Sequence, residues 1–71
     1  MDARMTPEQI AKLGALNERE AKTRAEMDAE MDARDAAPAD SVAHVEAHAR
    51  AGLLYKQLLQ IVREKSAVLG L

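Results

Sequence analysis

Apolar side chains in the second half of the chain recur at alternating spacings of four and three residues. This period places them on one stripe of a helix, and it is the pattern of a coiled-coil heptad. The positions on the stripe are Ala47, Ala51, Leu54, Leu58, Ile61, Lys65 and Val68. Lys65 is the one polar member, and its long stem can lie along the stripe while its charge reaches water. We expect an amphipathic helix over about 41–69.

More apolar side chains lie outside this stripe. Tyr55, Val62 and Leu69 flank it, and Leu53 and Leu59 lie further round the helix. At about 100° per residue, the apolar positions between 53 and 62 cover roughly two-thirds of the circumference. One neighbouring helix covers a stripe of only about 100°. The sequence therefore predicts that a second chain covers what the first helix leaves exposed.

The first half begins with a helix-start signal. In Thr6-Pro7-Glu8-Gln9 the threonine stands at the N-cap, the proline at the first helical position and the glutamine where a capping box needs it. Gly14 is the one poor helix former between Glu8 and about residue 36. A first helix over about 7–36 follows.

The first helix has a mixed inner face. Its apolar positions form two clusters, which are Ile10, Leu13 and Leu16 near its start and Met27 and Met31 near its end. Between them the same stripe carries Asn17, Glu20 and Arg24. These polar residues either fix the register inside the seam or face water where the helices diverge, and the scarcity of buried charge favours the second reading.

The turn belongs at Ala37-Pro38-Ala39, because the residue before a proline is pushed out of the helical region. Asp40 or Ser41 can cap the second helix. So short a connection makes the helices antiparallel neighbours. The fold prediction is a single all-α domain over 1–71: an antiparallel, coiled-coil-like hairpin with a turn at 37–40 that pairs into a dimeric four-helix bundle. The alternative is one long helix kinked at Pro38.

Composition supports this interpretation. The chain has 71 residues, 15 of them alanine, and no cysteine, so disulfides and thiolate metal sites are excluded. Small domains without disulfides or metals often rely on self-association. The net charge of −2 gives no global attraction to nucleic acid or membrane. Without a membrane-length apolar run or a signal-like N-terminus, we expect a cytoplasmic protein that does not enter membranes.

Candidate chemistry is sparse. His44 and His48 are four residues apart with Asp40 one turn earlier, which could set three ligands toward one metal. The segment differs from the zinc-protease pattern, and two partly exposed histidines are the favoured interpretation. No nucleophile context or glycine-rich phosphate loop occurs. We predict no enzyme activity, no cofactor and no metal.

Basic residues give little support for nucleic-acid binding. Three of them share one side of the first helix and three scatter around the second: Lys12, Arg19, Lys22, Lys56, Arg63 and Lys65. One tyrosine offers no stacking platform for single strands. A regulator that binds nucleic acid through paired helices remains an alternative, as does a structural assembly subunit.

Residues 26–40 carry a charge of −5. Negative charge near a helix C-terminus opposes the macrodipole. An ordinary solvated face is the favoured interpretation, and the functional one is an acidic docking surface for a basic partner. The candidate residues are Glu26, Asp28, Glu30, Asp32 and Asp35.

These observations predict a small non-enzymatic module for protein–protein interaction, a homodimeric helical accessory or regulatory protein of a bacterium or phage that modulates a larger partner. The residues expected at the interface with a second copy or another protein are apolar: Ile10, Leu13, Leu16, Leu53, Leu54, Tyr55, Leu58, Leu59, Ile61, Val62, Val68 and Leu69.

Overall fold

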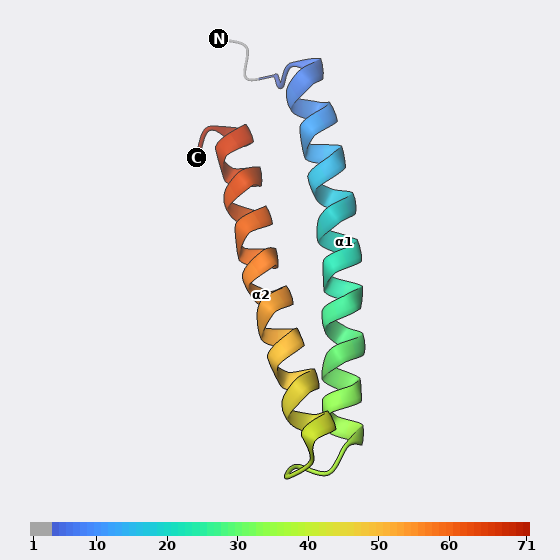
Figure 1. Ribbon diagram of the computed structural model, residues 1–71. Helices are drawn as coiled ribbons and strands as arrows, with labels where there is room; N and C mark the ends of the chain where they lie inside the picture. The colour runs from blue at the N-terminus through green and yellow to red at the C-terminus, as the bar shows by residue number, and fades with distance from the viewer. Residues whose placement is uncertain (1–3) are drawn as a thin grey trace.

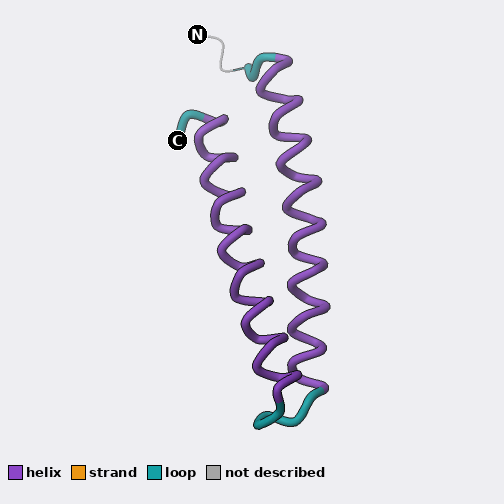
Figure 2. The backbone as a smooth tube through the Cα atoms, in the orientation of Figure 1, coloured by secondary structure: helices purple, strands orange, loops and turns teal. Residues whose placement is uncertain are grey.

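The computed structural model describes residues 4–71 and contains two helices, α1 (Pro7–Ala36) and α2 (Val42–Leu69). They lie side by side and antiparallel, so the start of α1 and the end of α2 are at the same end of a rod of 58 × 17 × 13 Å (Figure 1). The predicted all-α hairpin is confirmed, and the alternative of one long kinked helix is wrong. The turn occupies the short segment between Ala36 and Val42 (Figure 2).

Both helices begin with side-chain caps. The Thr6 hydroxyl accepts a hydrogen bond from the Gln9 amide (3.1 Å), and the Gln9 side-chain oxygen accepts one from the Thr6 amide (2.8 Å). This is the capping box that the sequence indicated. Ser41, rather than Asp40, caps α2, because its hydroxyl accepts from the His44 amide (3.2 Å) and donates to the Pro38 carbonyl (2.7 Å).

The end of α2 is closed by Gly70, whose φ of 77° lies in the left-handed region that favours glycine. The Gly70 amide donates to the Ala67 carbonyl (3.2 Å), and the Leu71 amide donates to the Ser66 carbonyl (2.9 Å). These two bonds form the Schellman pattern. They satisfy carbonyl groups that the helix itself leaves without partners.

The hydrophobic core is small. Its buried apolar side chains are Leu16, Ala47, Ala51, Leu58 and Ile61, of which two are alanines. Ile61, only 2% exposed, is the largest side chain that is almost fully buried. A single layer of contacts between two helices buries little more than this, which is why small helical domains commonly add a further layer by self-association.

Candidate interaction surface

The seam predicted on α2 faces α1. Ala47, Ala51, Leu58 and Ile61 are buried, and Leu54, Lys65 and Val68 are half-buried. His44 continues the same period toward the turn and is also half-buried. The heptad period of α2 therefore identifies the buried apolar side chains that this helix packs against its neighbour.

The matching seam on α1 is shifted by one position from the predicted stripe near the start of the helix and again at Thr23. Gln9 is half-buried while Ile10 is 56% exposed, and Thr23 is buried while Arg24 is exposed. The observed positions are again spaced by four and three residues: Gln9, Leu13, Leu16, Glu20, Thr23, Met27, Glu30 and Arg34. Placing Ile10 in the seam was wrong, because the period that includes Leu13 and Leu16 passes through Gln9. The favoured expectation of a water-facing position agrees with the exposure of Asn17 and Arg24.

Gln9 occupies the seam because both ends of its amide are satisfied there. Its oxygen completes the capping box with Thr6, and its Nε2 donates to the carbonyl oxygen of Val68 on α2 (3.0 Å). A buried amide is tolerated when its polar atoms are paired. Neither propensity nor hydropathy indicates this contact, since it depends on where the end of α2 lies.

Ion pairs link the helices along their length. Lys65 Nζ lies 3.2 Å from Glu20 Oε1 in the middle of the seam, with the two side chains 26% and 22% exposed. Arg19 pairs with Glu64 (3.1 Å) at a more exposed position, and Arg50 pairs with Glu30 nearer the turn. Glu20 therefore lies inside the seam as one half of an ion pair. For this residue, the favoured expectation of a water-facing position is wrong.

The hairpin itself uses part of the interface expected for a partner. Leu16, Leu58 and Ile61 have at most 8% of their surface exposed, so they have no surface to offer another molecule. Leu13, Leu54 and Val68 are half-buried between the helices. These six side chains hold α1 against α2, and only the remaining members of the predicted set are accessible.

The accessible members gather mainly on one flank of α2. Tyr55, Leu59, Val62 and Leu69 are 41–55% exposed, and Val45, on the same flank, is 62% exposed. They belong to a second run with spacings of three and four residues, which Gly52 and Ser66 complete together with His48. We call this run the outer stripe: Val45, His48, Gly52, Tyr55, Leu59, Val62, Ser66 and Leu69. At the heptad period it lies about 100° round α2 from the inner seam.

Leu53 lies apart from the outer stripe. It is 60% exposed and lines an open pocket of about 470 Å³ together with Leu54 and with Ala29 and Glu30 of α1. The pocket's rim also carries Arg50, which pairs with Glu30. Leu53 and Tyr55 were both expected at the interface with a partner, but they lie on different sides of α2.

The acidic residues of α1 also divide into two groups. Glu26 and Glu30 border the pocket, and Glu30 is engaged with Arg50. Asp28, Asp32 and Asp35 are exposed and, at about 100° per residue, fall within roughly 60° of one another on the outer side of the helix. Of these three, Asp35 also pairs with the Arg34 guanidinium, so Asp28 and Asp32 carry most of the negative charge available to a partner.

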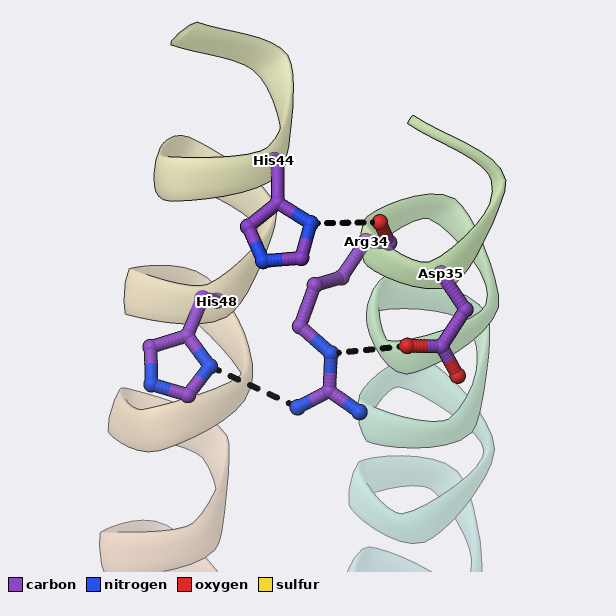
Figure 3. Close-up of polar contacts among 4 residues, drawn as sticks. All are labelled: Arg34, Asp35, His44 and His48. Atoms are coloured by element: carbon purple, nitrogen blue, oxygen red, sulfur yellow. Dashed lines mark hydrogen bonds and ion pairs between the residues drawn. The ribbon is translucent and has the colours of Figure 1, made fainter. Parts of the chain in front are cut away.

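The two histidines bind α1 rather than each other (Figure 3). Because a carbonyl oxygen only accepts, His44 Nδ1 must donate to the Arg34 carbonyl, 2.8 Å away. The Arg34 guanidinium, which pairs with Asp35 (3.0 Å), also donates to His48 Nδ1 at 3.4 Å. Among residues 4–71, no three His, Cys, Asp or Glu side chains come close enough to hold a metal ion.

Two of the six basic residues considered for nucleic-acid binding are engaged between the helices. Arg19 and Lys65 are paired with Glu64 and Glu20, so their charge is partly neutralised within the hairpin. Within the described part of the chain, neither helix combines the length and apolar character needed to cross a membrane.

Together, the fold and its surface define a helical hairpin with one covered seam and one uncovered apolar stripe. Comparisons with protein-family models, with curated proteins and with solved structures found no match. The function must therefore be inferred from the geometry of the hairpin.

Proposed function

We propose that this chain is a non-enzymatic protein-interaction module that acts as a homodimer, in which two hairpins pack into a four-helix bundle. The observation that carries the proposal is the outer stripe of α2, where four large apolar side chains remain 41–55% exposed. Because about half of each side chain is already covered, leaving the rest in water forgoes roughly half of the ~1.5–3 kcal/mol that full burial gives, or about 3–6 kcal/mol for the four together. That loss is a large part of the whole stability of a small domain, about 5–15 kcal/mol.

The angle between the two stripes supports a bundle. In a four-helix bundle each helix contacts two neighbours in directions close to a right angle to one another, with small crossing angles. The inner seam and the outer stripe of α2 are about 100° apart at the heptad period. α2 is thus suited to contact α1 of its own chain along one stripe and another helix along the other.

A homodimer of this kind would leave its outer faces for a larger partner. The exposed carboxylate of Asp32 lies on the outer side of α1, with Asp28 and Asp35 beside it at the edge of the flank that would face a second copy, and it suits a basic surface. The regulatory role that we propose is to bind such a protein and change its activity. Capture from the native host, with wild-type protein and with a D28K/D32K variant that sedimentation shows to be equally dimeric, compared at two salt concentrations, tests this second contact. Equal capture by both proteins at both salt concentrations argues against it.

The test of the homodimer is sedimentation velocity over a range of micromolar concentrations, with a matched pair of variants. Leu59→Lys places a charge in the outer stripe, and Leu53→Lys makes the same change on the other side of α2. Because a two-fold dimer carries every change twice, L59K is expected to raise the dimer dissociation constant by at least about 100-fold. L53K is expected to change it less than about threefold.

Circular dichroism on both variants keeps this result interpretable, since each must retain the helix content of the wild type. The homodimer is refuted if the wild-type chain is a cooperatively melting monomer at micromolar concentration. If L53K and L59K weaken association equally, the outer stripe is refuted as the surface through which the dimer forms.

A further inference from the structure

The outer stripe is self-complementary in one orientation, and the geometry points to a definite interface: α2 packs antiparallel against α2 of a second copy, with the two-fold axis between Tyr55 and Leu59. This inference rests on the proposed homodimer and specifies which helices meet and in which register. It is drawn from the order of large, small and polar side chains along the stripe, starting from its centre.

Near the axis, large side chains meet partners of suitable size. The register places Tyr55 opposite Leu59 of the other copy, and each symmetric pair occurs twice. One step outward, Gly52 lies opposite Val62 of the other copy. A Cβ built at Gly52 has no neighbour within 4 Å in the hairpin, so the backbone there is open to an approaching side chain. Large-against-small packing of this kind fills space without strain.

Toward the ends of the stripe, the same register matches polarity. His48 lies opposite Ser66 of the other copy, and Val45 lies opposite Leu69. His48 and Ser66 are the two residues of the outer stripe with hydrogen-bonding side chains apart from Tyr55. Because polar groups that lose water need partners, pairing them with each other is more favourable than placing either against leucine.

Other arrangements break these matches. Sliding the antiparallel pair by one heptad toward the start of α2 sets His48 against Leu59, and sliding it the other way sets Tyr55 against Ser66. A parallel, in-register pair sets Gly52 against Gly52 and His48 against His48, which leaves a gap in one layer and two imidazoles in another. The antiparallel orientation also opposes the two helix dipoles.

Pairing α2 with α1 of the second copy is excluded by polarity. The corresponding flank of α1 has apolar side chains near its two ends, but from Asn17 to Asp28 it carries no large apolar side chain. Its members are Ile10, Gly14, Asn17, Ala21, Arg24, Asp28, Met31 and Asp35. Docking the apolar stripe of α2 there would bury charges against Tyr55 and Val62. When α2 meets α2, these polar residues of α1 meet α1 of the second copy instead, at the rim of the bundle.

The area is sufficient for a stable dimer. The paired length of α2, from Val45 to Leu69, is about 37 Å at 1.5 Å per residue, and a helix presents a strip about 10 Å wide. The α2 contact thus covers roughly 400 Å² per copy, and a similar strip of α1 brings the total near the ~800 Å² per partner of a standard interface.

Cross-linking tests the register directly, since the natural sequence contains no cysteine. Ala49, Lys56 and Arg63 are one heptad apart along the border of the outer stripe and are exposed, so single cysteines there disturb neither seam. In the proposed register Lys56 lies opposite Lys56 of the other copy, and Ala49 lies opposite Arg63. A short bis-maleimide should therefore cross-link K56C with itself, and A49C with R63C only when the two proteins are mixed.

Each alternative gives a different pattern, because a slip of one heptad moves the partners about 10 Å apart. A slip in one direction cross-links A49C with K56C, and a slip in the other direction cross-links K56C with R63C. A parallel pair makes all three variants behave alike. If the protein sediments as a dimer and gives any of these patterns, the proposed register is wrong and the homodimer is unaffected. Monomeric sedimentation together with no cross-link overturns both.

Discussion

The Lys65 ammonium and the Glu20 carboxylate meet in the middle of the seam between α1 and α2, with Nζ 3.2 Å from Oε1. The pair lies one turn from Leu16 on α1 and one turn from Ile61 on α2, both of which are buried. Since each side chain is only about a quarter exposed, the pair lies between a surface salt bridge and a buried one. It specifies which turn of α1 lies beside which turn of α2.

Removing one member of this pair should destabilise the hairpin more than removing both. Glu20→Gln leaves the Lys65 charge without its partner and is expected to lower the free energy of unfolding by about 1 kcal/mol. The double change Glu20→Leu with Lys65→Leu fills the same space with apolar groups and should be at least as stable as the wild type. Urea unfolding at one fixed protein concentration measures both values.

The exposed pair Arg19–Glu64 provides the control, with side chains 58% and 39% exposed. Arg19→Ala should change the free energy of unfolding by less than about 0.5–1 kcal/mol, because water screens the interaction. For the Glu20–Lys65 pair, the double Leu variant is compared with Glu20→Leu and Lys65→Leu alone. If its loss of stability equals the sum of the two single losses, desolvation does not offset the attraction between the charges in the seam.

Truncation of Ile61 should give the largest loss of any single apolar residue in α2. At 2% exposure its side chain is enclosed by the hairpin, so Ile61→Ala removes burial and leaves a cavity, for a loss of about 2–5 kcal/mol. Leu53→Ala, at 60% exposure on the same helix, should lose only a few tenths of a kcal/mol. Chemical denaturation of the two variants compares them, and similar losses would show that the seam is assigned to the wrong face.

Two glycine substitutions should act in opposite directions. Gly70→Ala forces a side chain into the left-handed region at φ 77°, with an expected loss of about 1 kcal/mol. Gly14→Ala lies in the interior of α1, where an added Cβ has nothing within 4 Å, so it should stabilise the helix by about 0.5–1 kcal/mol. Thermal unfolding followed by circular dichroism gives the sign of each effect, and a gain for G70A would contradict the cap.

The two histidines should contribute unequally to the turn. His44 donates to the last turn of α1 through the Arg34 carbonyl at 2.8 Å, so His44→Ala should lose about 0.5–1.5 kcal/mol and speed hydrogen exchange around the turn. His48→Ala removes a longer, exposed contact of 3.4 Å with the Arg34 side chain and should leave exchange there unchanged. Equal exchange rates in the two variants would remove the distinction.

The sequence by itself determined where the helices begin and end and which face of α2 turns inward. Thr6-Pro7 and Gly70 act through local backbone geometry, which neighbouring residues settle without the rest of the chain. The inner seam of α2 follows from apolar side chains repeated over three heptads, a signal strong enough to fix its phase. The sequence also predicted that α2 carries more apolar surface than α1 can cover, because Tyr55 and Leu59 lie outside the inner seam.

Only the tertiary structure decided which side chains of α1 face inward. Its seam contains Gln9, Glu20 and Thr23, so hydropathy distinguishes poorly between this stripe and the adjacent one that contains Ile10 and Arg24. A polar side chain of α1 can face inward where α2 supplies a partner for it. The Val68 carbonyl is the partner of Gln9, and the Lys65 ammonium is the partner of Glu20. Polar contacts between segments far apart in sequence have no local signal, because their free energy depends on the position of both groups.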